Sequence, residues 1–208
     1  ETNVENFTTK YPRSPLTERA RFLRLDCLYR QTLRYELDQA PTNRCLSALA
    51  EYLRDYPSND HISECEAMLK DLNDRLDTKA YEAAKLYYKM EDYLAARVAL
   101  RNVLKDDAEN IYREDILFYT AKSSYKYAQL SVPQKQRERY LVFIDDYLNF
   151  KGENPESKYV KELDYLYSRA QKALGKRSED YEKEIKEKAY AKERKKLEKA
   201  LAKEKKQK

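Results

Sequence analysis

Residues 81–108 read YEAAKLYYKMEDYLAARVALRNVLKDDA, and this stretch decides the fold. Ala84 and Tyr87 recur at helical spacing before a short polar break, and Ala96 and Leu100 recur after it. The two small residues let a pair of helices approach closely, and the large ones fill the groove between them. This order of small and large side chains is typical of a tetratricopeptide helix pair.

Apolar residues recur at helical spacing along almost the whole chain, including a run from Asp60 to Met90 that contains no Gly or Pro. A helix-end pattern occurs as Phe7-x3-Tyr11-Pro12 and Tyr52-x3-Tyr56-Pro57. Weaker copies follow as Val103-x3-Asp107-Ala108, at the end of the quoted stretch, and as Phe143-x3-Tyr147-Leu148. These copies are 45, 51 and 40 residues apart, longer than an ideal unit of about 34 residues. We therefore expect an all-α, right-handed tetratricopeptide-like superhelix of about four antiparallel helix pairs. The array covers residues 1–175 and starts midway through a repeat, and a charged helical tail covers residues 176–208.

Composition supports this fold class and excludes others. Only 2 Gly and 6 Pro occur in 208 residues, which argues against a dinucleotide-binding sheet, a phosphate-binding loop or a β-rich fold. Formal net charge is +5, but residues 176–208 alone hold 14 basic and 8 acidic side chains. The rest of the chain is nearly neutral, so we expect no nucleic-acid partner. The tail is expected to be a solvated helix, with contact to acidic partners or anionic head groups as the alternative.

The sequence contains no group of residues with the spacing that a catalytic or metal-binding site requires. Cys27, Cys45 and Cys65 are far apart in the sequence and form no close pair, and the single His61 cannot complete a zinc site with them. We expect the thiols to lie in helix interfaces, and we expect no enzyme activity, cofactor or metal. No apolar stretch approaches the ~18 residues that a membrane span requires.

Local signals give two further expectations. Asn154-Pro155 is typical of a helix N-cap followed by proline at the first helical position. The acidic pairs Asp106-Asp107 and Asp145-Asp146 are expected at the C-terminal ends of helices, facing solvent.

Two stretches resemble a known family. They are Tyr35-Glu36-Leu37-Asp38-Gln39 followed by Thr42, and AKLYYKMEDYLAAR from Ala84 to Arg97. On these stretches the chain from Tyr11 to Ala173, roughly three quarters of its length, resembles the BamD family of tetratricopeptide lipoproteins. The family has Gly in the turn of the quoted pair, where this chain has Glu91-Asp92; the change is tolerated if the turn needs no positive φ.

The resemblance implies a non-catalytic scaffold on the periplasmic face of the outer membrane, held by a lipid anchor that this chain lacks. Its implied partners are the POTRA region of the barrel-inserting subunit and segments of unfolded outer-membrane proteins. From the residues alone, a cytosolic tetratricopeptide adaptor that binds peptides or partner proteins stays open as the alternative.

The loop of residues 33–41 is longer than a usual repeat turn and offers several hydrogen-bonding groups. The candidate client-binding residues on and beside it are Tyr29, Arg30, Tyr35, Glu36, Asp38 and Gln39. The alternative is a structural loop in which Tyr35 and Leu37 pack back on the neighbouring helices.

A second candidate surface lies in the C-terminal repeat. Exposed tyrosine next to arginine is typical of interface anchors, and family analogy points to this region for POTRA docking. The candidate residues are Tyr127, Arg137, Arg139 and Tyr140.

Overall fold

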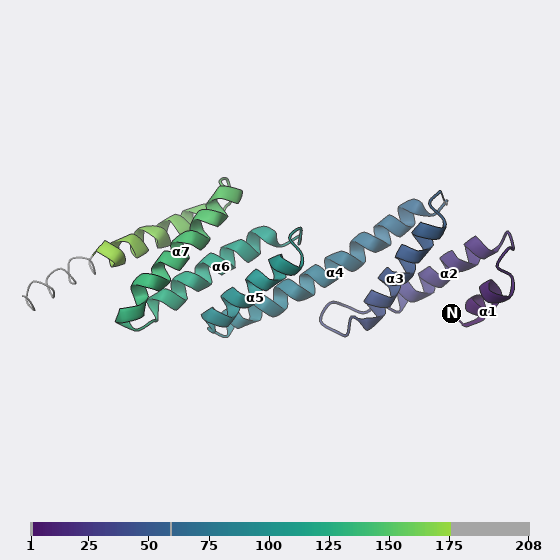
Figure 1. The fold of residues 1–208 in the computed structure, drawn as a ribbon, viewed down its shortest axis with the longest axis horizontal. Helices are drawn as coiled ribbons and strands as arrows, with labels where there is room; N and C mark the ends of the chain where they lie inside the picture. The colour runs from purple at the N-terminus through teal and green to yellow at the C-terminus, as the bar shows by residue number, and fades with distance from the viewer. Residues whose placement is uncertain (1, 59, 176–208) are drawn as a thin grey trace, which may run out of the picture. The chain divides into compact units, whose positions relative to one another are not determined.

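A computed structural model describes residues 2–58 and 60–175 (Figure 1). Its helices are α1 (Thr2–Lys10), α2 (Thr17–Arg30), α3 (Ala40–Asp55), α4 (Ile62–Lys89), α5 (Tyr93–Asp106), α6 (Arg113–Gln129) and α7 (Pro133–Glu153), and residues 160–175 are also helical. No strand occurs among the described residues. The predicted all-α, tetratricopeptide-like repeat fold is confirmed, whereas the predicted tail, residues 176–208, lies outside the described residues.

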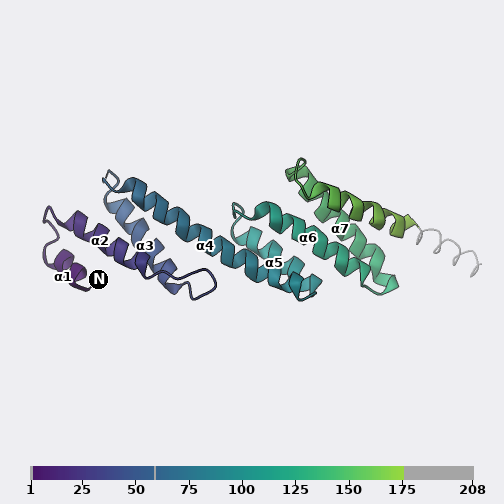
Figure 2. The same ribbon diagram turned by 180° about the vertical axis from the view of Figure 1, so that it is seen from behind.

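The chain divides into two compact units, and the boundary between them runs through α5. Among the described residues, the first unit comprises residues 2–90 and 102–113, and the second comprises residues 91–101 and 114–175. In the first unit α1 packs on α2, α2 on α3, and α3 on α4. Both views of the ribbon show these helices side by side (Figures 1 and 2).

The core of the first unit is a cluster of mostly small and aliphatic side chains around the buried ring of Tyr52. Leu49, Leu72, Cys45 and Cys65 are fully buried in it. All three cysteines are free thiols, and burial raises the pKa of Cys45 to about 11. The Cys45 thiol therefore stays protonated at neutral pH and acts as a small apolar core residue.

The core of the second unit contains more aromatic rings beside its aliphatic side chains. Phe143 and Phe150 are fully buried, and Tyr159 stacks on Phe118 with ring centroids 4.0 Å apart. Both views show α6, α7 and the helix of residues 160–175 side by side (Figures 1 and 2). Tyrosine is thus used as a packing residue here, which explains part of the chain's count of 20.

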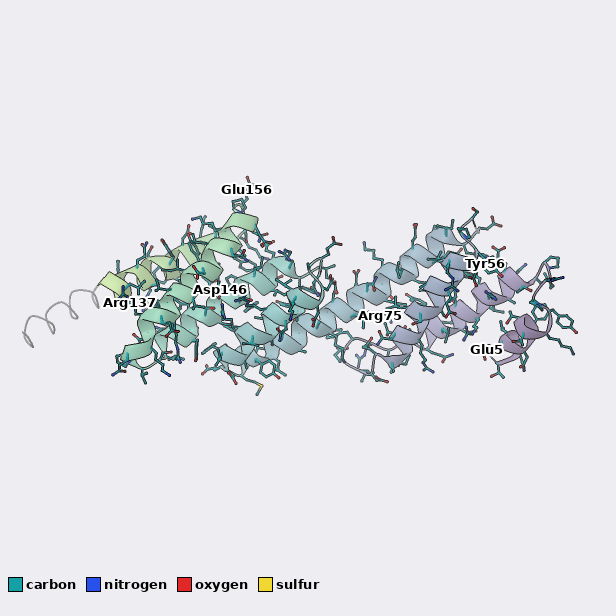
Figure 3. The ribbon with its side chains drawn as sticks, in the orientation of Figure 1. Glu5, Tyr56, Arg75, Arg137, Asp146 and Glu156 are labelled. Carbon is teal, nitrogen blue, oxygen red and sulfur yellow. The ribbon has the colours of Figure 1, made fainter. Side chains whose placement is uncertain are left out.

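A largely buried acid joins three helices of the second unit. Asp146 accepts hydrogen bonds from Arg97 Nε at 2.6 Å and from Arg97 Nη2 at 3.1 Å, and it also accepts one from the Ser124 hydroxyl. The side chains of Arg97 and Asp146 are only 19% and 12% exposed. The expectation that Asp146 faces solvent at a helix end is wrong, because this residue lies inside α7 (Figure 3) and charge pairing offsets its burial.

One capping prediction is also wrong. Asn154 is the C-cap of α7 rather than an N-cap, and the next helical residue is 160. Proline does occupy the first turn of α3 and of α7, at Pro41 and Pro133, where its missing N–H costs little. The local sequence of residues 154–155 therefore starts a turn, because the backbone around Asn154 still closes the preceding helix.

The turn between α4 and α5 has a positive φ, so the condition under which the change from glycine is tolerated without strain is not met. Glu91 has φ 63°, the only positive φ among the described residues. A side chain with a Cβ in the left-handed region is strained by roughly 1–2 kcal/mol. The chain therefore carries a non-glycine residue at the position where glycine fits best.

We expect Glu91→Gly to raise the free energy of unfolding by about 0.5–1 kcal/mol, because relief of the strain exceeds the extra backbone entropy that glycine loses on folding. Urea unfolding followed by circular dichroism measures the change. Glu91→Ala is the matched control, since it removes the same charge but keeps the Cβ. Equal stabilisation by both variants would assign the effect to charge and not to backbone strain.

We expect Asp146→Ala to lower the free energy of unfolding by about 2–3 kcal/mol, because it leaves Arg97 largely buried without its carboxylate. The double variant Arg97→Met with Asp146→Leu is expected to lose less than the single variant, since no buried charge remains. The same urea titration compares them. A double variant at least as unstable as Asp146→Ala contradicts this account.

Candidate partner-binding sites

The α2–α3 loop, residues 31–39, is held against one face of α4. Asp71, Arg75 and Lys79 recur every four residues, so they share that face. Arg75 Nη1 donates to Thr32 Oγ1 at 2.8 Å. Lys79 Nζ donates to the carbonyl oxygens of Tyr35 at 3.1 Å and of Leu37 at 2.7 Å. Two cations of α4 thus bind the loop mainly through its backbone and leave loop side chains for other contacts.

Tyr29 belongs to the same assembly through its hydroxyl group. It donates to Asp71 Oδ2 at 2.7 Å, and the Arg75 guanidinium carbon lies 5.7 Å from the Tyr29 ring centroid. Arg75 also pairs with Asp71. The hydrogen bond to Asp71, followed by burial, raises the pKa of Tyr29. Tyr29 is therefore a protonated donor that fixes the end of α2 to α4 (Figure 3 labels Arg75).

Two of the loop candidates have structural partners. Gln39 is 7% exposed, and its amide nitrogen donates to the carbonyl oxygens of Arg34 at 2.8 Å and Leu37 at 3.1 Å. Its amide oxygen accepts from Thr42 at 2.8 Å. Asp38 Oδ1 accepts from the Ala40 N–H at 3.1 Å at the start of α3. The expectation that Gln39 offers its amide to a partner is corrected, because burial and these bonds occupy it.

Several other side chains of the loop are exposed or half-buried. Glu36 is exposed and Tyr35 is half-buried, whereas Leu33 and Leu37 are 40% and 46% exposed. Leu37 is therefore not fully packed back on neighbouring helices. Arg30 is exposed and pairs with Asp26 one turn earlier. The structure brings Tyr29 and the loop together through α4, and it directs Arg30 to a separate surface pair.

Sequence reasoning missed Asp71, Arg75 and Lys79, which carry the loop. Their spacing of four residues was the available signal. This spacing does not identify the residues as loop-binding, because a solvent-facing helix shows the same series of acidic and basic residues.

We expect Arg75→Gln with Lys79→Gln to loosen the loop while α3 and α4 remain folded, because the loop loses its two cationic donors. Amide hydrogen exchange of residues 31–39 measures this, and we expect about tenfold faster exchange for a loss of roughly 1–2 kcal/mol of local stability. Lys70→Gln with Lys105→Gln, two exposed lysines outside these contacts, is the charge-matched control. Unchanged exchange in the first variant contradicts the clamp.

The second candidate surface surrounds the α6–α7 turn. The Arg139 guanidinium carbon lies 3.9 Å from the Tyr127 ring centroid, a cation–π contact, and Arg139 Nη1 donates to the Ser131 hydroxyl. Gln136 Nε2 donates to the carbonyl oxygens of Gln129 at 3.1 Å and Ser131 at 2.8 Å. These contacts fix the turn, and Tyr127 and Arg139 are indeed brought together.

The other two candidates of this surface, Tyr140 and Arg137, differ in exposure. Tyr140 is only 5% exposed, and its ring lies 5.9 Å from that of Tyr125 in the second unit's core. Its nomination as an exposed anchor is corrected, because α7 turns this side chain inward. Arg137 is exposed, and so are the apolar side chains of Leu130 at 70% and Val132 at 56%. The turn surface therefore consists of two apolar side chains beside two arginines.

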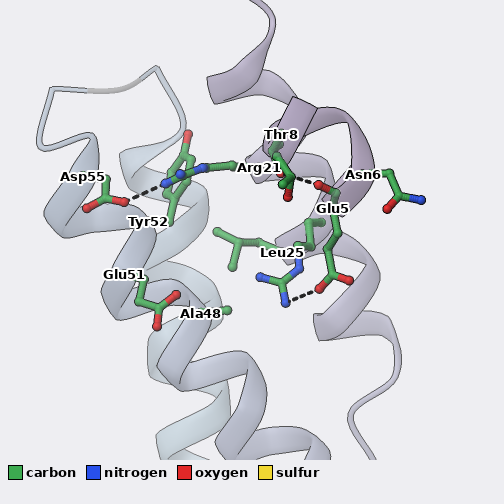
Figure 4. A pocket seen from close by; sticks show the side chains of 11 residues that line it. Glu5, Asn6, Thr8, Arg21, Leu25, Ala48, Glu51, Tyr52 and Asp55 are labelled. Carbon is green, nitrogen blue, oxygen red and sulfur yellow. Dashed lines mark hydrogen bonds and ion pairs between the residues drawn. The ribbon is translucent and has the colours of Figure 1, made fainter. Parts of the chain in front are cut away.

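A polar pocket of about 540 Å³ lies among α1, α2 and α3 (Figure 4). Ion pairs cross it, from Arg21 to Asp55 at 2.6 Å and from Arg24 to Glu5 at 2.7 Å. All four side chains are 32–47% exposed, so each pair contributes at most about 1 kcal/mol. The pairs connect α2 to α1 and to α3, so the pocket is a joint between these helices.

Comparison with known proteins identifies the family. A family model described as YfiO, outer membrane lipoprotein, matches residues 1–142. The chain belongs to this family. The chain is also 25% identical, over 116 residues, to the outer membrane protein assembly factor BamD of Caulobacter vibrioides. That match covers 56% of this chain and 38% of the relative, so the chain spans less than half of the relative's length.

The family match supports the BamD-like resemblance drawn from the sequence and confirms the predicted outer-membrane localisation. Within the described residues, no helix combines the length and the apolar character required to cross a membrane. The same residues contain no group of three or more His, Cys, Asp or Glu side chains suited to a metal ion.

Proposed function

We propose that this chain is a non-catalytic scaffold of outer-membrane protein assembly on the periplasmic face of the outer membrane, where a lipid anchor holds it. The observation that carries the proposal is a pair of preorganised surfaces on a chain of the YfiO family. Each surface is a turn or loop fixed by its own charged contacts, with unpaired side chains left outward. Preorganised surfaces bind with little loss of conformational entropy.

The α6–α7 turn is the docking surface proposed for the POTRA region of the barrel-inserting subunit. Leu130 and Val132 supply exposed apolar area, and Arg137 and Arg139 flank it. Arginine beside apolar and aromatic groups is enriched at the centres of protein interfaces. The relative from Caulobacter vibrioides is itself an outer membrane protein assembly factor, which favours a partner from that machinery.

The α2–α3 loop is the surface proposed to recruit segments of unfolded outer-membrane proteins. Such segments are extended and rich in alternating apolar side chains. Leu33, Tyr35 and Leu37 are alternate residues on a loop whose backbone α4 holds in place. Glu36 adds an exposed carboxylate beside them. We retain Tyr35 and Glu36 as the contact residues of this surface and assign Asp38 and Gln39 to loop structure.

Affinity capture tests both surfaces. Arg137→Ala with Leu130→Ala is expected to lower the affinity for the POTRA region about tenfold or more, since it removes one charged and one apolar anchor. Lys172→Ala with Leu148→Ala, a pair of exposed side chains elsewhere in the second unit, is the matched control. Tyr35→Ala with Glu36→Ala is expected to weaken capture of an unfolded outer-membrane protein and to leave POTRA binding intact.

The outcomes separate the two assignments. Full POTRA affinity in the Arg137 variant removes the turn from the proposal, and full client capture in the Tyr35 variant removes the loop. If the wild-type chain captures neither partner, scaffolding in outer-membrane assembly is refuted. Circular dichroism of every variant establishes that lost binding is not lost folding.

A further inference from the structure

A groove of about 660 Å³ lies in the first unit between α4 and residues 103–111. The Ile111 N–H donates to Asp77 Oδ2 at 3.0 Å. The ring of Tyr112 stacks on Tyr81 with centroids 4.5 Å apart and planes 11° from parallel. The hydroxyl groups of Tyr112 and Thr78 are hydrogen-bonded at 3.2 Å. The segment is therefore fixed to α4, and the groove is a built feature of the unit.

Part of the groove lining is apolar. Leu76 and Ala80 of α4 line it together with Val103 of α5 and Ile111. Ile111 is 56% exposed, although its own backbone N–H is held by the Asp77 carboxylate. A large aliphatic side chain fixed in this exposed place offers area that a bound apolar group would cover.

The rest of the lining is strongly acidic. Five carboxylates border the groove with one lysine, Lys70; they are Asp74, Asp77, Asp106, Asp107 and Glu109. None of these six side chains forms an ion pair with a described residue. On the other face of α4, by contrast, Asp71 is paired with Arg75. The carboxylates of the groove have no such partner among the described residues, and together they produce a local negative potential.

One of these acids, Asp77, lies where its charged form is disfavoured. Burial, together with the neighbouring Asp107 carboxylate, raises the pKa of Asp77. Like charges held together in a partly desolvated site cost stability unless a cation joins them. The fold therefore accepts an unfavourable electrostatic arrangement at this groove, which a positively charged occupant would relieve.

We propose that this groove binds a polypeptide segment of a partner protein in which lysine or arginine stands next to large apolar side chains. Its cations would face the carboxylates, and its apolar side chains would cover Ile111 and Val103. Charge complementarity and the mixed lining together select this occupant. A metal ion is disfavoured, since the described residues contain no group of carboxylates with a metal-binding arrangement.

The site is distinct from the α2–α3 loop surface. Asp77 and Ala80 lie more than 100° around α4 from Asp71 and Arg75, at 100° per residue. The proposal is independent of the assembly role proposed above, because it depends only on the groove. Loss of POTRA or client capture would leave it untouched.

Fluorescence anisotropy on the full chain tests the proposal with a labelled ten-residue peptide in which lysine and leucine are interspersed with serine. We expect saturable binding that weakens as salt rises. The variant Asp106→Asn, Asp107→Asn, Glu109→Gln is expected to weaken binding about tenfold, since three charge contacts are lost. Peptides with glutamate for lysine or serine for leucine are expected to bind more weakly than the parent.

The control variant Glu66→Gln, Asp145→Asn, Glu156→Gln changes net charge by the same amount at exposed sites elsewhere. It is expected to bind the peptide within twofold of wild type. Equal weakening by both triple variants would reduce the effect to net charge and overturn the proposal, and so would absent binding to the wild-type chain. Tighter binding of a peptide with the sequence of residues 176–208, or dimerisation lost in the groove variant, would reassign the groove to this chain's own tail or to a second copy.

Asp77→Asn separates binding from structure. The asparagine oxygen can still accept the Ile111 N–H, while the unfavourable charge is removed. We expect a higher midpoint of thermal unfolding together with weaker peptide binding. A purely structural role for Asp77 predicts the opposite sign for stability, so a lowered midpoint with unchanged binding contradicts the site.

Discussion

The first unit depends on α4, a 28-residue helix that no glycine or proline interrupts. A helix of this length is about 42 Å long at 1.5 Å per residue, so it can hold separate features at different heights and on different faces. Arg75 and Lys79 bind the α2–α3 loop on one face. Asp77 and Thr78 hold residues 111–112. Without this continuous helix, neither the loop nor the acidic groove would have a rigid base.

The second unit uses a different kind of constraint. Aromatic rings fill its core, and Asp146 receives donors from α5 and α6 inside it. A buried carboxylate fixes geometry more strictly than an apolar contact does, since it needs its donors at particular places. The α6–α7 turn joins two of the helices that this carboxylate connects. Its exposed arginine and apolar side chains are therefore presented in one arrangement.

Each unit contains a local arrangement that lowers its stability. Glu91 adopts a left-handed backbone conformation that its Cβ disfavours, and Asp77 keeps a carboxylate beside another carboxylate. The two costs differ in meaning. The strain at Glu91 lies in a connecting turn, where an acidic residue replaces the glycine expected there. The charge at Asp77 faces a groove with exposed apolar lining, where a ligand could compensate it.

The sequence by itself determined the helical repeat and its family, because helix periodicity and the order of small and large residues are local properties. It also placed the candidate loop and turn, since proline and polar breaks are read from neighbours in the chain. Tertiary structure alone decided which candidates are free. Gln39 and Tyr140 look like contact residues by type, yet packing buries both. Asp146 looks solvated, yet Arg97, 49 residues away in the sequence, neutralises it. Burial and ion pairing depend on distant residues meeting in space, and no local pattern encodes which of them meet.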